Sequence, residues 1–122
     1  MAAFLGCVPV CALSPYSRNW AIVARVVSKG KLRTFKSKNA GDDREDERLF
    51  DVSVVDQEGG EIKCNFFNAA ADLCYDKMEV GKCFKMSKGT VRSSNRRFNC
   101  TNNPYEIVFE KVIDIELVED EP

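Results

Sequence analysis

The chain contains no histidine, no C-x-x-C pair, no Gly-rich phosphate-binding loop and no apolar run long enough to cross a membrane. Without histidine, a cysteine nucleophile would lack its usual imidazole base, and a zinc site would lack one of its commonest ligands. Residues 4–13 are apolar, but they follow no basic segment of the kind that begins a signal peptide. The sequence therefore predicts no catalytic residues, no metal, no cofactor and no membrane partner.

The cysteines are not spaced as a metal site, and several lie in apolar runs typical of buried thiols. They are Cys7, Cys11, Cys64, Cys74, Cys83 and Cys100. With 122 residues the chain can bury a core without crosslinks. We therefore expect reduced, metal-free thiols and a location in the nucleus or the cytosol.

Acidic residues are missing from two segments that are rich in basic ones. Residues 18–38 carry seven basic residues and no acid, and residues 82–105 carry six more and again no acid. The acids gather instead in residues 42–47 and in the C-terminal tail, so the net charge of -1 hides a polarised molecule. This distribution favours a face that binds a polyanion, although a merely solvated basic face has the same pattern.

One predicted strand, residues 61–67, carries an unusual row of side chains. Alternate side chains of a strand point to opposite faces, and here they form two different rows. The core row is apolar and consists of Ile62, Cys64 and Phe66. The other row consists of Lys63, Asn65 and Phe67. A cation, an amide and an aromatic ring on one face suit a ligand with phosphates and flat bases, although the ring could instead cover the base of the following helix.

The remaining periodicity predicts an all-β domain with one short helix. Strands are expected over residues 20–27, 32–35, 49–56, 61–67, 83–92, 105–109 and 112–118. A helix is expected over residues 69–78, capped by Asn68 and stopped by Gly81. Three strands, a helix and further strands are the order of a five-stranded OB-fold Greek-key barrel.

This fold sets the expected boundaries and the expected binding face. We predict a flexible N-terminal arm over residues 1–13, the barrel over residues 14–118, and an acidic tail or the start of a linker over residues 119–122. OB-fold barrels bind ligands on their second and third strands and with the loops after the first and fourth strands. Phe67 falls on the third strand, and both basic segments reach those loops. The polyanion face and the expected ligand face therefore coincide.

Several motifs also resemble one known family. They are Leu13-Ser14-Pro15-Tyr16, Trp20 with Ala24-Arg25-Val26, Leu32-Arg33-Thr34-Phe35, Phe66-Phe67-Asn68, and Ser87-Lys88-Gly89-Thr90-Val91 followed by Phe98 and Tyr105-Glu106. Together they resemble the first high-affinity DNA-binding domain of the large subunit of replication protein A, over residues 12–109. The resemblance implies a nuclear module that binds single-stranded DNA within a heterotrimer, in replication, repair and recombination, with telomeric single strands as a further candidate ligand.

The resemblance also implies roles for particular residues. Phe67 and Phe98 match the two rings on which bases stack, and Arg33, Lys63 and Arg92 match basic positions that contact phosphates or bases. Asn68 and Glu106 match polar residues that hydrogen-bond bases. The predicted DNA-binding residues are Arg33, Phe35, Lys36, Ser37, Lys38, Lys63, Asn65, Phe67, Asn68, Arg92, Arg96, Phe98 and Glu106.

The chain departs from the family pattern in two places. Residues 36–48 are longer and more acidic than the corresponding loop, so that Lys36, Ser37 and Lys38 are approximate matches. Only a short arm precedes the module, whereas the family's large subunit begins with a separate domain, which indicates a lineage without that domain or a shortened chain. Two alternatives remain open on the residues alone: an RNA-binding OB module, and an OB domain that docks acidic peptides. The implied partners are single-stranded DNA and other replication protein A subunits, the latter through regions outside this chain.

Overall fold

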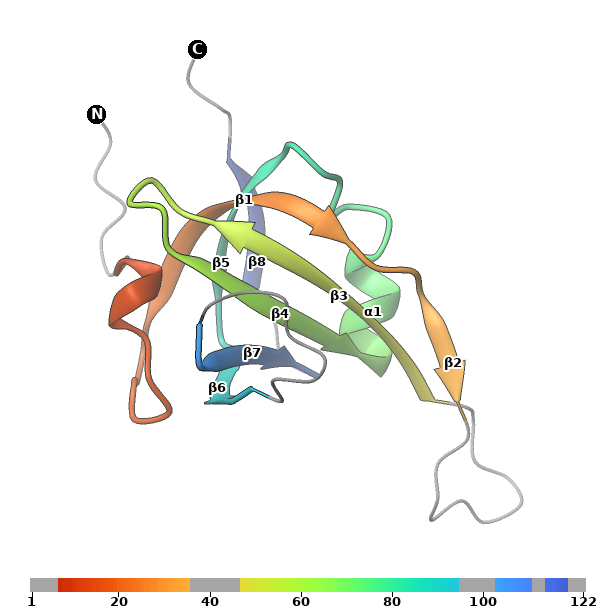
Figure 1. Ribbon diagram of the computed structural model, residues 1–122. Helices are drawn as coiled ribbons and strands as arrows, with labels where there is room; N and C mark the ends of the chain where they lie inside the picture. Colours follow the sequence, from red (N-terminus) through yellow and green to blue (C-terminus); the bar gives the residue numbers. More distant parts are fainter. Residues whose placement is uncertain (1–6, 36–46, 95–102, 111–113, 119–122) are drawn as a thin grey trace.

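The computed structural model describes residues 7–35, 47–94, 103–110 and 114–118, in which eight strands form one curled sheet (Figure 1). In chain order the elements are the 3-10 turn η1 (Val10–Ala12), β1 (Ala21–Lys29), β2 (Arg33–Phe35), β3 (Glu47–Val55), β4 (Glu61–Phe67), α1 (Asn68–Cys74), β5 (Cys83–Ser87), β6 (Thr90–Ser93), β7 (Tyr105–Phe109) and β8 (Asp114–Val118). Strands predominate and the helix is short, as the sequence predicts.

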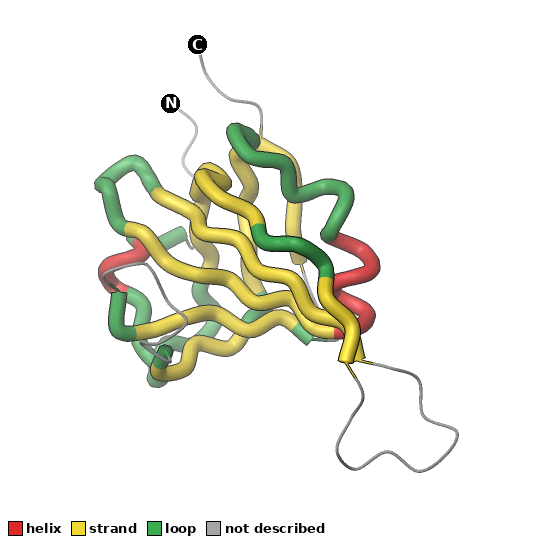
Figure 2. The backbone as a smooth tube through the Cα atoms, turned by 45° about the vertical axis from the view of Figure 1, so that its right-hand side comes forward, coloured by secondary structure: helices red, strands yellow, loops and turns green. Residues whose placement is uncertain are grey.

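The strand order makes the sheet curl back on itself (Figure 2). β1 pairs antiparallel with β3, β3 with β4, and β4 pairs parallel with β7. β6 continues the sheet beyond β7, while β5 pairs with the other edge of β1. Because β5 and β6 follow each other in the chain, the bend between them connects β5, next to β1, with the edge strand β6. Taken as bent strands, β1 with β2 and β5 with β6 complete the predicted five-stranded barrel, to which β8 adds at β5.

The bend between β5 and β6 depends on Gly89. A Cβ atom at this position would lie 2.6 Å from Ile107 Cγ2 and 2.8 Å from Phe109 Cε1. The preceding residue, Lys88, has a left-handed φ of 67°. The sequence predicts one continuous strand over residues 83–92, but the chain divides into two strands at this bend, where Gly89 packs closely against β7.

The core lies inside the curled sheet and is closed by α1 at one end (Figure 1). The predicted core row of β4 is confirmed, because Ile62, Cys64 and Phe66 are completely buried. The Phe66 ring stacks between Phe50 and Phe109, with centroids 4.8 Å and 4.9 Å away. Such aromatic stacking fixes the orientation of β4, and with it the face that β4 turns outward.

The N-terminal segment belongs to the packed structure from residue 7 onward. The sequence predicts a flexible arm over residues 1–13, but Val10 and Leu13 are buried in the core. Val10 N donates a hydrogen bond of 2.7 Å to Asp56 Oδ2, and Val8 N donates one of 2.8 Å to Ala21 O. The packed structure therefore begins before the predicted boundary, because the apolar residues of this segment complete the core. Residues 1–6 and the tail lie outside the described residues.

The helix is shorter than predicted and begins differently. It ends at Cys74, whereas the sequence predicts residues 69–78. Asn68 is its first residue, not its cap, and adopts a left-handed φ of 50°. Gly81, with φ of 96°, follows the turn after the helix. None of the helices in the described parts of the chain has the length and apolar character needed to cross a membrane.

Candidate nucleic-acid interface

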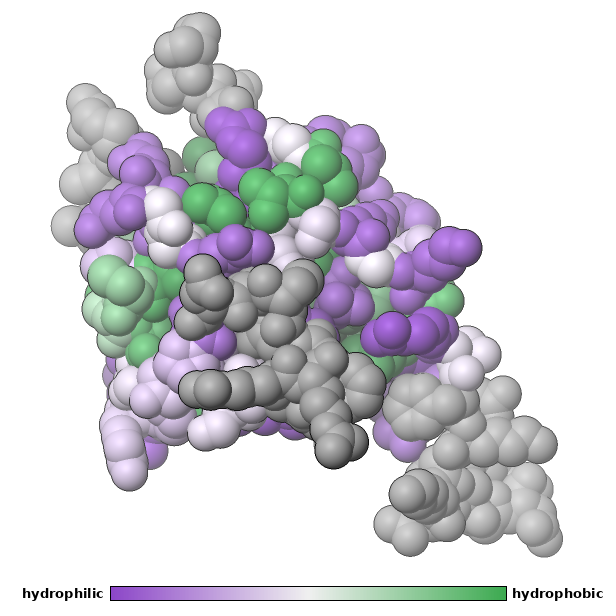
Figure 3. All heavy atoms as spheres, viewed as in Figure 1, coloured by the Kyte–Doolittle hydropathy of each residue, from purple (hydrophilic) through white to green (hydrophobic). Residues whose placement is uncertain are grey.

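A groove of about 480 Å³ lies on the outer face of the sheet, across β2, β3, β4, β6 and β7. It is lined by Arg33, Leu49, Asp51, Lys63, Asn65, Phe67, Arg92 and Glu106. Six of these residues are among those predicted from the sequence. The surface seen in Figure 3 is mostly hydrophilic, with smaller apolar patches.

Strand register explains why these residues meet. Lys63 on β4 is paired with Glu106 on β7, which is paired with Arg92 on β6. At the other end of the groove, Phe67 is paired with Leu49 on β3, which is paired with Arg33 on β2. Between these two rows Asn65 is paired with Asp51. Residues paired across strands lie on the same face of a sheet, so the predicted outer row of β4 becomes the floor of the groove.

Both arginines of the groove are held by carboxylates of the neighbouring strand. Arg92 Nε lies 2.7 Å from Glu106 Oε2, and Arg33 Nη2 lies 3.4 Å from Asp51 Oδ1. The Glu106 side chain is only 7% exposed, whereas that of Arg92 is 52% exposed. The pair therefore anchors the arginine from below and leaves its outer side open to a ligand. With Lys63 included, cations outnumber carboxylates among the described residues that line the groove, which favours an anionic ligand.

Among the described residues that line the groove, Phe67 is the only aromatic one. Its side chain is partly buried, unlike that of Phe66, which points into the core. A partly exposed ring in the same groove as lysine and arginine can offer one face to a flat base while the cations meet the flanking phosphates. Phe67 lines the groove together with Leu49, its partner on β3, and so is not confined to covering the base of α1.

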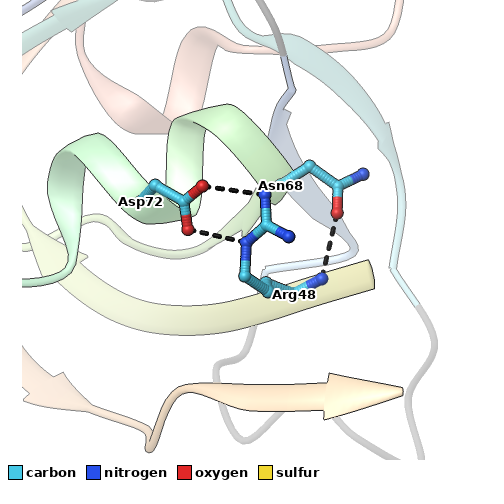
Figure 4. A network of polar contacts seen from close by, with 3 residues as sticks. All are labelled: Arg48, Asn68 and Asp72. Carbon is cyan, nitrogen blue, oxygen red and sulfur yellow. Dashed lines mark hydrogen bonds and ion pairs between the residues drawn. The ribbon is translucent and has the colours of Figure 1, made fainter. Parts of the chain in front are cut away.

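A set of polar contacts ties the start of β3 to the start of α1, immediately after Phe67 (Figure 4). Arg48 Nε and Nη2 donate to the two carboxylate oxygens of Asp72, at 2.7 Å and 2.8 Å. Arg48 N donates to Asn68 Oδ1 at 2.9 Å. Asn68 therefore links the start of α1 to β3 instead of capping the helix. Its left-handed backbone and these bonds fix the turn that follows Phe67.

The other predicted residues are not among the described residues that line the groove. Asn68 does not line the groove, and its amide oxygen is engaged by Arg48 N. Phe35 ends β2 opposite Glu47, but its side chain is outside what the structure describes. Five predicted residues lie outside the described residues, namely Lys36, Ser37, Lys38, Arg96 and Phe98. Their roles remain predictions.

Leu49 and Asp51 were missed by the sequence analysis. The alternation of β3 already set Asp51 apart from the core row of Phe50, but its partner on β4 depends on the hairpin register. Gly30 also matters here, because a Cβ atom at this position would lie 2.7 Å from Asp51 Oδ1. The bend between β1 and β2 thus makes room for the carboxylate that holds Arg33.

The buried cysteines are poor nucleophiles. Burial raises the pKa of the Cys64 thiol far above its ordinary value. Burial also raises the pKa of Cys74, partly offset by the positive charge of Lys77. Within the described ranges, no group of three or more cysteine, aspartate and glutamate side chains is placed to hold a metal ion. The groove is therefore the best-supported functional site in the described structure.

The architecture and the groove define an OB-fold barrel with a candidate nucleic-acid interface. Comparison with known proteins narrows this class. The family model described as "Domain of unknown function DUF223" matches residues 11–121. The solution structure of DNA binding domain A of S. cerevisiae replication protein A is 32% identical, with a TM-score of 0.71, and the match covers 95% of this chain and 96% of that one. The chain belongs to the family of these replication protein A DNA-binding domains, as the sequence motifs predict.

Two further relatives agree with this assignment. One of the replication protein A 70 kDa DNA-binding subunits of Arabidopsis thaliana is 39% identical over 114 residues. The match covers 93% of this chain but 17% of that relative, so the chain spans a small part of its length. A chain in the structure of a replication protein A heterotrimer bound to single-stranded DNA is 35% identical, with a TM-score of 0.81, and the match covers 93% of this chain and 25% of that one.

Proposed function

We propose that this chain binds single-stranded DNA with little dependence on base sequence. The observation that carries the proposal is the common face of Phe67 and Lys63 in a groove that also holds Arg33 and Arg92. A stacking ring and a track of cations recognise what all single strands share, namely base faces and phosphates. The named functions of the related domains and subunits support the same ligand.

Within this proposal, each groove residue has a role. Arg33, Lys63 and Arg92 meet phosphates or base edges, and Phe67 stacks on a base. Asn65 and Glu106 can hydrogen-bond base edges from the floor of the groove. The predicted loop residues, including Phe98 as a second stacking ring, and Asn68 complete the set. A strand with its bases unstacked can place them on these rings, whereas a duplex keeps its bases inside.

The direct test is a titration of the purified chain with fluorescently labelled oligonucleotides. We expect saturable binding of an oligo(dT), similar affinity for mixed and telomeric-repeat DNA of equal length, and much weaker binding of the matched duplex. Preference for oligo(rU) would favour the RNA-binding alternative, and binding of acidic peptides without any oligonucleotide would favour the interaction domain. Either result would overturn the proposal.

We further propose that the chain acts as a non-enzymatic DNA-binding module of a replication protein A complex in the nucleus, in replication, repair and recombination. The relatives that support this are large DNA-binding subunits and a heterotrimer. Other subunits would be contacted by regions outside this chain. Co-purification of the full-length protein with its partners, and its localisation in cells, test this part separately from DNA binding.

A further inference from the structure

A second cavity, of about 440 Å³, lies beside β6 where the N-terminal segment meets the bend between β5 and β6. Its lining includes Arg18, Asn19, Ser87, Lys88 and Thr90. The two parts of the chain meet because Ala21, at the start of β1, is paired with Ser87, at the end of β5. The residues that precede β1 therefore lie next to the residues that follow β5.

The charge of this cavity differs from that of the groove. The described residues that line the cavity include two cations and several hydroxyl groups, but no aspartate or glutamate. Among the described residues, Lys88 has no hydrogen-bond or ion-pair partner, and Arg18 donates only to the carbonyl oxygen of the preceding Ser17. In the groove, by contrast, both arginines are paired with carboxylates. Uncompensated cations beside hydroxyl donors make a site for an anion.

The backbone of Lys88 gives a second, independent reason to expect a bound anion in this cavity. Its φ of 67° lies in the left-handed region, which costs a residue with a Cβ roughly 1–2 kcal/mol relative to the ordinary conformations. Glycine would remove that cost, and an exposed lysine side chain offers no packing in exchange. A lysine at such a position is explained if its ammonium group binds something.

The position of the cavity indicates which anion it binds. Thr90 lines the cavity and Arg92 lines the groove, and the two residues lie on the same face of β6. Residues two apart on a strand are separated by roughly 7 Å. A nucleic-acid strand that passes Arg92 can therefore continue over β6 to Lys88 and Arg18.

We propose that this cavity is a second phosphate-binding subsite, which holds the backbone of a DNA strand extending beyond the groove. The inference rests on the proposed single-strand binding and extends it in length. Bases at the groove stack on Phe67, while the cavity takes only the charged backbone of the following nucleotides.

The test compares short and long oligo(dT) within the range of roughly 4–16 nucleotides that one OB fold occupies. For the longer strand, Lys88→Gln and Arg18→Gln should each flatten the dependence of log affinity on log salt by roughly 0.7 per lost contact. For the shorter strand, which fills the groove alone, neither variant should change the slope. Lys77→Gln is the matched control, because this exposed lysine follows α1 and lines none of these cavities.

Lys88→Gly separates charge from folding. Glycine suits the left-handed backbone, so this variant should melt at an equal or higher temperature than the parent chain. Its salt dependence of binding to the longer strand should nevertheless be flattened as much as that of Lys88→Gln. An unchanged slope for the longer strand in all variants would overturn the subsite. An equally flattened slope for short and long strands would also contradict the subsite, because the lost charges would then act through the overall electrostatic potential of the protein and not through a local contact. Loss of acidic-peptide binding with unaltered DNA slopes would make the cavity a protein-docking site.

Failure of the underlying function would look different. If the parent chain binds neither length of oligo(dT), the proposed function itself is wrong. If the parent chain binds both lengths of oligo(dT) and Phe67→Ala weakens the binding of each, the proposed function of the groove is supported independently of the results for the cavity variants.

Discussion

Phe66 and Phe67 are neighbours in sequence and have opposite environments. Phe66 is completely buried between two stacked rings, whereas Phe67 is partly exposed in the groove. The two environments differ because successive side chains of a strand point to opposite faces of the sheet. Phe66 therefore serves as a matched control for experiments on Phe67.

We predict that Phe67→Ala weakens single-strand binding by about 1–3 kcal/mol, because one base loses its stacking partner. The melting temperature should change little. Phe66→Ala should instead cost about 3–5 kcal/mol of folding stability, because it opens a cavity in the core. Thermal melts and oligonucleotide titrations of both variants provide the comparison.

Phe98→Ala extends the same experiment to the predicted second ring. If each ring stacks on a different base, the double variant should lose nearly the sum of the two single losses. A large fall in melting temperature for Phe67→Ala, with normal binding by the folded fraction, would make that ring a core residue and remove the stacking argument.

The two arginines of the groove should respond differently to substitution. Both should flatten the salt dependence of binding by roughly 0.7 when replaced by alanine, as should Lys63. Arg92→Ala should in addition destabilise the fold by about 1–2 kcal/mol, because the nearly buried Glu106 carboxylate loses its partner. Arg33→Ala should not, because Asp51 is more exposed and the pair is longer.

Salt-dependent titrations and denaturant melts of the three single variants measure both effects. Unchanged slopes in all three would mean that the basic residues form only a solvated face. Equal stability of the Arg33 and Arg92 variants would mean that Glu106 is hydrated in the native protein.

The junction of β4 and α1 couples an ion pair to the aromatic platform. Arg48, Asn68 and Asp72 fix the turn after Phe67, yet the Asp72 side chain is 48% exposed. An exposed ion pair stabilises a fold by only about 0–1 kcal/mol. Its main effect is expected to be on the direction of β4 as it leaves the sheet, and so on the ring of Phe67.

We predict that Asp72→Asn leaves the melting temperature within a few degrees of the parent value but weakens single-strand binding several-fold. Glu79→Gln is the control, because it breaks the surface pair with Lys82, which lies outside the groove lining. NMR signals of labelled Phe67 should broaden only in the Asp72 variant. Normal DNA affinity of that variant would show that the platform is rigid without the ion pair.

The distribution of charge over the whole molecule should matter for ligand choice more than its net charge of -1. The acidic run of residues 42–47 follows β2 in the sequence and ends at the first residue of β3, and both strands contribute residues to the groove lining. A duplex is too wide and stiff to enter such a groove, so it would meet the negative charge of this segment without the compensating contacts.

We predict that replacing the acids of residues 42–47 by their amides raises duplex affinity more than single-strand affinity. Filter-binding or anisotropy titrations with a strand and its duplex, at one salt concentration, measure the difference. Equal gains for both ligands would leave the segment with no part in selectivity.

The fold was accessible from the sequence because its signals are local. Alternation predicted the core row of β4, and the strands expected over residues 49–56 and 61–67 correspond to β3 and β4, which pair antiparallel. The division of β5 from β6 was not accessible, because it depends on Gly89 meeting Ile107 and Phe109 from a distant strand. The length of α1 was overestimated for a different reason, since the local apolar spacing continues through the turn after the helix.

By itself, the sequence determined the class of the barrel, the outer row of Lys63, Asn65 and Phe67, and the basic character of the ligand face, because strand periodicity and charge are written residue by residue. The tertiary structure decided which carboxylates hold the arginines, that Asn68 binds Arg48 N instead of capping the helix, and that Arg18 and Lys88 share a cavity. Those facts depend on register between strands and on the close approach of segments far apart in the chain, and no local pattern encodes either.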